Sequence, residues 1–133
     1  MITFSELVSG PIPPEHQKNI QILLDKINKL REAYGKPLKV TSGYRSKAKH
    51  LAIYAAKGIT DQSKIPMQSK HLEGLAVDLI PLDQPIAQFQ KWIKDNEKLM
   101  AEIGLWFEDF SATKTWVHAQ AVAPKSGKRF FLP

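Results

Sequence analysis

The sequence predicts an α+β domain with a small, largely antiparallel sheet flanked by about three helices. Apolar residues recur at helical spacing in three stretches, and short apolar runs between and after them are typical of strands. The last two of these runs are joined by a short turn, which allows a hairpin. The 133 residues contain no internal repeat, low-complexity tract or interdomain linker, so we expect a single domain over residues 1–133.

The three helices are expected over residues 13–35, 46–58 and 83–104. In the first helix, prolines suit the first turn and a glycine suits the C-cap. Ser46 is the expected N-cap of the second helix and Asp83 that of the third. The apolar stripe of the first helix is interpreted as core and consists of Ile20, Leu23, Leu24, Ile27, Leu30 and Tyr34.

Strands are expected over residues 38–42, 75–80, 105–110 and 115–122, with residues 126–133 as a tail. The second of these strands is an otherwise apolar run that contains an aspartate. A buried carboxylate costs free energy unless a positive group pairs with it or it binds a metal. This strand is therefore the first candidate for a functional site.

Composition limits the kind of site. The chain has no cysteine, which excludes disulfides and thiolate metal ligands, so any metal site must use His, Asp and Glu. The net charge of +6 favours anionic partners such as a bacterial wall, but no nucleic-acid-binding motif is present, and we do not expect nucleic acid as the main partner. No apolar run is long enough for a membrane helix.

Strand alternation suggests how a metal site could form. Asp78 lies on one face of the strand over 75–80, and His118 lies on one face of the strand over 115–122. If these strands are neighbours, both side chains project into one cleft, and Gly74 would let the chain turn so that His71 reaches the same point. Two imidazoles and a carboxylate match a catalytic zinc site. The alternative is that each histidine is a hydrogen-bonded core residue.

Three motifs then carry a family resemblance. "SKHLEGLAVDL" fits the pattern S-x-H-x-x-G-x-A-x-D, "SGYRS" lies upstream of it, and "WVH" lies near the C-terminus. Together they resemble peptidase family M15, the zinc D-alanyl-D-alanine carboxypeptidases and endolysins, whose fold is shared with the hedgehog signalling domain. The resemblance implies Zn²⁺ as cofactor, held by His71, Asp78 and His118. It also implies that Arg45 binds a substrate carboxylate or the developing oxyanion, and that Ser69 helps to hold the peptide.

The general base departs from the family pattern. Many members carry an acid three residues before the last histidine, where this chain has Thr115, which cannot take a proton from water near neutral pH. Glu108 and Asp109 are the nearest acids, and alternation places them on opposite faces of their strand, so that only one can face the metal. We favour Glu108 because it reaches farther and an apolar setting would raise its pKa. Glu73 is a third candidate that we expect to face solvent.

These inferences give a functional hypothesis. We expect a zinc metallopeptidase that hydrolyses peptide bonds of the peptidoglycan stem or cross-link, with Glu108 and Arg45 as the catalytic residues. The alternative is a catalytically inactive, zinc-containing module of the same fold that binds the cell wall or a partner, a reading that Thr115 favours. A nucleic-acid-binding protein is a weaker alternative.

Expectations about the setting follow from the same resemblance. The N-terminal residues lack the pattern of a secretory signal, so we expect synthesis in the cytoplasm. The protein would then act at the bacterial cell wall as a phage-type lysin, after a partner permeabilises the membrane. We prefer a monomer, although the sequence leaves the oligomeric state open. We interpret the other two histidines, His16 and His50, as surface residues.

Overall fold

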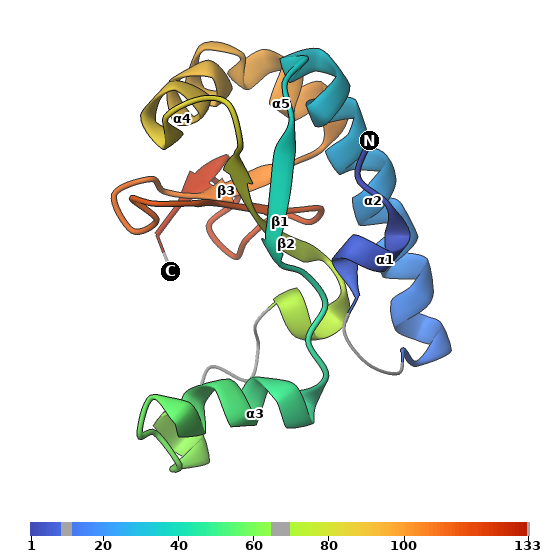
Figure 1. Cartoon of the computed structure of the whole chain (residues 1–133), viewed down its shortest axis with the longest axis vertical. Coiled ribbons are helices and arrows are strands. Elements are labelled where there is room, and N and C mark those ends of the chain that lie inside the picture. The colour runs from blue at the N-terminus through green and yellow to red at the C-terminus, as the bar shows by residue number, and fades with distance from the viewer. Residues whose placement is uncertain (9–11, 65–69, 133) are drawn as a thin grey trace.

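The computed structural model describes residues 1–8, 12–64 and 70–132. Within them, five strands form one sheet in the order β1-β2-β4-β3-β5 (Figure 1). The β1–β2, β2–β4 and β3–β4 pairs are antiparallel, and the β3–β5 pair is parallel. The strands are β1 (Leu38–Ser42), β2 (Ala76–Pro81), β3 (Trp106–Glu108), β4 (Val117–Gln120) and β5 (Phe130–Phe131). The predicted α+β class with a largely antiparallel sheet is confirmed.

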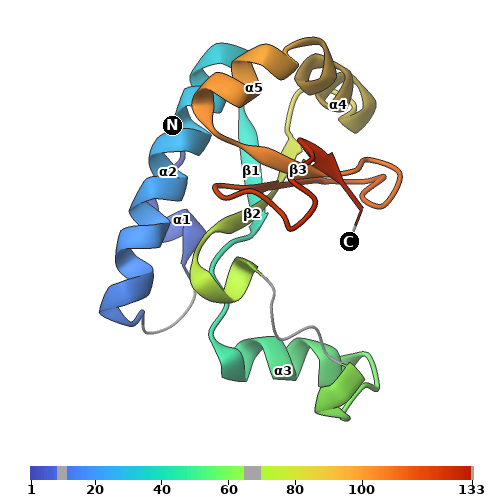
Figure 2. The ribbon, with the colours of Figure 1, turned by 180° about the vertical axis from the view of Figure 1, so that it is seen from behind.

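The described part of the chain also forms five α-helices. They are α1 (Phe4–Leu7), α2 (Pro14–Tyr34), α3 (Lys47–Ala56), α4 (Ile86–Asp95) and α5 (Glu97–Ile103), with short 3₁₀ helices η1 (Gln62–Lys64) and η2 (Lys70–Glu73). Figures 1 and 2 show α2 along one side of the sheet, α4 and α5 at one end, and α3 at the opposite end, apart from the rest. No helix that the structure describes is long and apolar enough to span a bilayer.

The predicted caps of the first two helices are confirmed. The backbone N–H of Gly35 closes α2 by donating to the carbonyl of Arg31 over 3.0 Å. The side chain of Ser46 caps α3 by accepting a hydrogen bond of 3.2 Å from the backbone N–H of Lys49.

The prediction of one continuous third helix over 83–104 is wrong. The segment forms two helices, and α4 begins only after Pro85, which is its N-cap. A residue that precedes a proline is disfavoured in the helical region, so Gln84 separates Asp83 from the helix that it was expected to cap. Asn96 interrupts the pattern at φ −114° and ψ 32°, and α5 starts directly after it. The tail over 126–133 also differs from expectation, since it contributes β5 to the sheet.

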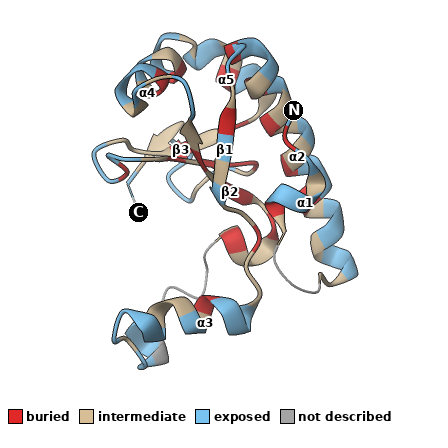
Figure 3. Cartoon of the chain, viewed as in Figure 1, coloured by how far each residue is buried: buried red, intermediate tan, exposed pale blue. Residues whose placement is uncertain are grey.

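The hydrophobic core leaves one face of the central strands available. Val77 and Leu79 of β2 and Phe107 of β3 belong to the same buried cluster as the apolar stripe of α2. The intervening side chains Asp78 and Glu108 are only half-buried. Figure 3 shows the buried positions concentrated on the strands and on α2, α4 and α5, while most of α3 is exposed or half-buried.

Candidate metal centre and active site

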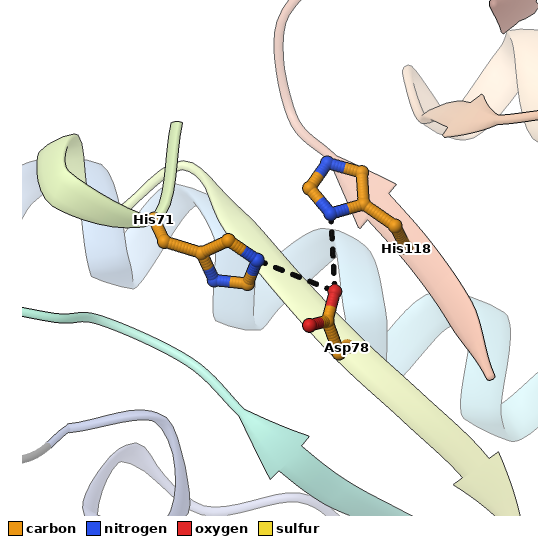
Figure 4. Close-up of side chains that lie close together, drawn as sticks. All are labelled: His71, Asp78 and His118. Atoms are coloured by element: carbon orange, nitrogen blue, oxygen red, sulfur yellow. Dashed lines mark hydrogen bonds and ion pairs between the residues drawn. The ribbon is translucent and has the colours of Figure 1, made fainter. Parts of the chain in front are cut away.

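The register of β2 and β4 brings two of the expected ligands together. Asp78 pairs with His118 across these antiparallel strands, and the carboxylate Oδ1 lies 3.0 Å from the ring Nδ1 of His118. His71, on η2, approaches the same oxygen with its Nε2 at 3.3 Å (Figure 4). One ligand atom from each of the three residues lies within 4.8 Å of the other two. The predicted convergence of the three side chains is therefore observed.

Gly74 allows η2 to turn directly into β2. Its φ is +75°, in the left-handed region that favours glycine. A Cβ at this position would also lie 2.6 Å from a side-chain carbon of Ile20 and 3.2 Å from the carbonyl oxygen of His16, both on α2. The turn is thus packed tightly against α2, and it returns His71 to the level of Asp78 as expected.

Hydrogen bonds to the far ring nitrogens orient both imidazoles. The Nδ1–H of His71 donates to the carbonyl oxygen of Gly43 over 2.8 Å, which leaves Nε2 with its lone pair toward Asp78. The Nε2 of His118 lies 3.1 Å from Oε1 of Gln120. The amide nitrogen of Gln120 donates to the carbonyl of Val122 over 3.0 Å, so its Oε1 is the atom that accepts from His118. The Nδ1 of His118 therefore also presents a lone pair to Asp78.

The electrostatics of the cluster favour a cation. Burial alone raises the pKa of Asp78, but the hydrogen bonds that His118 and His71 donate when their rings are protonated, together with the charges of those rings, hold that pKa well below its usual range. Burial alone lowers the pKa of His118, but the protonated ring donates a hydrogen bond to Asp78 and is attracted by its charge, and with smaller contributions from Gln120 and Glu108 these interactions raise the pKa overall. With both rings neutral, three acceptor atoms converge, and they repel one another unless a cation lies between them.

This donor set fits a divalent metal. Two imidazole nitrogens and one carboxylate oxygen, each oriented by a neighbour, match a zinc site that keeps one position for water or substrate. The side chains of the three residues are at most 15% exposed. A groove of about 770 Å³ opens over them, so a peptide could reach the cluster from that side.

The same groove contains two further charged residues from the sequence-based site. Glu108 lies on β3, and its Oε2 is 4.0 Å from Nδ1 of His118. The pairing of Trp106 with Gln120 sets this register and places Glu108, two residues on, level with His118. Arg45 also lines the groove, with its Nη2 at 4.0 Å from Oδ2 of Asp78. Ser69, the expected peptide-binding residue, lies outside the described residues.

Comparison with known proteins places the chain in a family. The family model described as Peptidase M15 matches residues 3–120. The chain belongs to this family. No curated protein sequence matches it. Membership identifies a peptidase family, so hydrolysis of a peptide bond is the chemistry that the site has to explain.

Solved structures that share the fold include VanYB and LdcB. VanYB, solved in complex with D-alanine-D-alanine, is 23% identical with a TM-score of 0.50 over 81% of this chain and 72% of VanYB. LdcB, an LD-carboxypeptidase whose structure concerns peptidoglycan recognition, is 21% identical with a TM-score of 0.54 over 90% of this chain and 66% of LdcB. At these identities the similarity establishes the fold alone, and this M15 chain spans about two thirds of LdcB.

The other residues that were considered for the general base do not line the groove of this M15 chain. Asp109 accepts hydrogen bonds from the backbone N–H of Ser111 over 3.0 Å and from its hydroxyl over 2.7 Å, which tie it to the turn after β3. Glu73 pairs with Lys70 over 3.1 Å. Thr115 is exposed. None of these three is among the described residues that line the groove.

Sequence reasoning missed two residues beside the site. His50 was expected at the surface, and this expectation is wrong, because His50 is fully buried next to Arg45. Gln120 received no role in the sequence-based site. Its position two residues from a proposed ligand was the available signal, since same-face neighbours in a strand are two residues apart. His16 is half-buried, with Nδ1 at 3.3 Å from the hydroxyl of Tyr44.

Proposed function

We propose that this chain is a zinc metallopeptidase that hydrolyses peptide bonds in the stem or cross-link of peptidoglycan. The observation that carries the proposal is the convergence of one ligand atom each from His71, Asp78 and His118 within 4.8 Å, beside a groove that also holds Glu108 and Arg45. Membership of the M15 family supports it independently.

In this proposal, His71 holds zinc through Nε2, His118 through Nδ1, and Asp78 through its carboxylate. The hydrogen bonds to Gly43 and Gln120 keep the two ring lone pairs aimed inward, so little reorientation is needed on binding. Bound zinc lowers the pKa of a water molecule enough to make it nucleophilic near neutral pH and polarises a carbonyl oxygen.

Glu108 is the proposed general base. Its carboxylate lies on the groove side of β3, 4.0 Å from a proposed ligand nitrogen, so a water near the ligand cluster is within reach of Oε2. The carboxylate accepts a proton from that water as the water attacks the carbonyl carbon. It can then pass the proton to the amine that leaves.

Arg45 is the proposed anchor for a carboxylate of the substrate, or for the oxyanion that develops on the scissile carbonyl. A guanidinium offers parallel N–H donors that match a carboxylate in a bidentate pair. Ser69 keeps its proposed role in peptide binding, which rests on the motif alone.

The substrate class follows from the groove and from the structural neighbours. A groove of about 770 Å³ has room for more than the two residues that flank a cleaved bond. VanYB binds D-alanine-D-alanine and LdcB concerns peptidoglycan recognition, which supports a stem-peptide substrate here. The net charge of +6 would favour an anionic wall, within the limit that salt screening sets.

The deciding experiment is digestion of purified peptidoglycan by the zinc-loaded protein, followed by mass spectrometry of the released fragments. We expect fragments that differ by cleavage of one defined peptide bond, and we expect a chelator to prevent their release. Fragments cut in the glycan strand, or equal release with chelator, would contradict the proposal. A lysin-like role is part of the same proposal, and it predicts faster clearing of permeabilised cells than of intact cells.

One observation favours a second candidate, a zinc-containing module that binds the wall without cutting it. The position that carries the general base in many relatives is Thr115, and it is exposed and outside the groove lining. This candidate predicts zinc binding and sedimentation with peptidoglycan, but no fragment in the same digestion.

A further inference from the structure

The buried His50 has no part in the proposed chemistry, although it lies beside the groove. It is the only residue of α3 that the structure describes as buried, with 0% of its surface exposed. Helix α3 itself lies apart from the sheet and the other helices (Figures 1 and 2). A fully buried imidazole on such a peripheral helix calls for a specific explanation, because histidine is seldom fully buried without a polar role.

Arg45 is one polar neighbour of His50. The His50 Nδ1 lies 3.5 Å from Nη1 of Arg45, which is longer than a typical hydrogen bond and therefore a weak contact as it stands. A guanidinium has donors only, so Nδ1 is the acceptor of this contact and its lone pair faces the arginine. The imidazole also packs on the ring of Tyr54, with centroids 5.0 Å apart, and Tyr54 lines the groove.

A second residue holds the guanidinium from another side. Both Nε and Nη2 of Arg45 lie 3.1 Å from the hydroxyl oxygen of Ser42, which accepts from them. Of the five N–H donors of an arginine, two are thus directed to Ser42 and one to His50. The remaining two belong to Nη1 and Nη2, and the Arg45 side chain is 18% exposed where it lines the groove.

We propose that His50 is a positioning residue that fixes the guanidinium of Arg45 in the orientation that binds a carboxylate of the substrate peptide. This inference rests on the proposed function, in which Arg45 is the carboxylate anchor. Holding a long side chain in one rotamer before binding reduces the entropy lost when the substrate binds. Acting together, His50 and Ser42 make Arg45 selective for a carboxylate over a neutral amide.

The test compares two peptides that contain the peptide bond whose cleavage the peptidoglycan digestion identifies. In one peptide the carboxylate next to that bond is free, and in the other it is amidated. The measured quantity is the ratio of kcat/KM for the free peptide to kcat/KM for the amidated peptide. His50→Leu removes the acceptor at similar volume, and we expect the ratio to fall about 10-fold or more. His50→Asn places an amide oxygen where Nδ1 lies, and we expect it to retain most of the ratio.

Two further variants separate positioning from folding. Ser42→Ala acts on the same guanidinium from outside α3, and it should lower the same ratio. Lys47→Ala, at an exposed position of α3, is the control and should leave the ratio unchanged. Zinc content and melting temperature are measured for every variant, and His50→Leu should keep the wild-type zinc content.

A double-mutant cycle decides the interpretation. If His50 acts through Arg45, adding His50→Leu to Arg45→Ala lowers the ratio no further. An equal loss on both peptides, or a full additional loss in the Arg45→Ala background, would overturn the inference. If Arg45→Ala removes the selectivity but His50→Leu does not, only the role of His50 is wrong. If Arg45→Ala leaves the ratio unchanged, the proposed role of Arg45 is wrong as well.

Discussion

Asp78 and His118 face one another across two hydrogen-bonded antiparallel strands, and the carboxylate Oδ1 lies 3.0 Å from the ring Nδ1. Two of the three proposed ligands are therefore positioned by the register of the sheet. A slip of one of these strands by one residue would turn its ligand to the opposite face of the sheet, away from the other ligand. The third ligand, His71, comes from a short 3₁₀ helix whose turn is packed against α2.

The first prediction concerns metal binding by Asp78. Replacing Asp78 with Asn removes the negative charge and leaves only a weak neutral oxygen ligand for zinc. We expect zinc affinity to fall by more than roughly 100-fold. This exceeds the typical effect of replacing a residue that only hydrogen-bonds to a metal ligand. Zinc per chain after dialysis against a weak chelator measures the change. Asp83→Asn removes an exposed acid after β2 and is the matched control.

Thermal unfolding provides a second readout of the same prediction. A ligand that binds only the folded state stabilises it by about 2.7 kcal/mol at a concentration 100 times its Kd. Zinc should therefore raise the melting temperature of the wild type and of Asp83→Asn, but not that of Asp78→Asn. An equal rise in all three proteins would mean that zinc binds elsewhere.

The second prediction separates catalysis from metal binding through Glu108. Glu108→Gln keeps the size of the side chain but cannot accept a proton from water, so kcat should fall by about 10² to 10⁴. Zinc content should stay at the wild-type level because Glu108 is not a proposed ligand. Asp109→Asn is the control, since its carboxylate is bound to Ser111 in a turn. Unchanged kcat in Glu108→Gln would move the base to another residue.

Much of this site was predictable from the sequence because strand alternation is a strict geometric rule. The pattern placed Asp78 and His118 on faces that match if their strands are neighbours, and the observed register pairs them directly. The choice between Glu108 and Asp109 depended on a register that the sequence does not encode locally. It follows from the pairing of Trp106 with Gln120, which is set by packing over the whole sheet.

The errors came from features that local patterns do not contain. Apolar periodicity continues across Asn96, so it did not indicate that the chain leaves the helical conformation there. The burial of His50 could not be read from α3, where the three residues before it are Lys47, Ala48 and Lys49. In the structure His50 lies against Arg45, five residues earlier, and such a contact depends on the tertiary path of the chain.

The third prediction tests the orientation of His118 by Gln120. In Gln120→Leu, Nε2 of His118 loses the acceptor that lies 3.1 Å away, and the ring can take the other tautomer or rotate. We expect zinc affinity to fall about 10- to 100-fold, the usual range for loss of such a partner. Competition with a zinc-binding dye measures it. Gln120→Glu retains an acceptor at this position and should bind zinc more tightly than Gln120→Leu, and the reverse order would contradict the role given to Gln120.

The last prediction concerns Gly43, which contacts both the N-terminal segment and His71 of the proposed metal site. Its carbonyl oxygen accepts the hydrogen bond from Nδ1 of His71, and a Cβ at this residue would overlap the backbone of Leu7. Leu7 is buried, and its carbonyl also accepts a 2.6 Å hydrogen bond from the backbone N–H of Tyr44, so it has little freedom to move away.

Gly43→Ala should therefore displace the carbonyl that orients His71. We expect a loss of about 1 to 3 kcal/mol in the free energy of unfolding, as for other overpacked sites, measured by urea denaturation without metal. Zinc affinity should fall as well. Gly127→Ala offers a comparison, because nothing lies near a Cβ there and only the strain of a positive φ remains. It should cost stability without lowering zinc affinity. If Gly43→Ala binds zinc as tightly as Gly127→Ala does, the hydrogen bond from His71 to Gly43 does not orient the ligand.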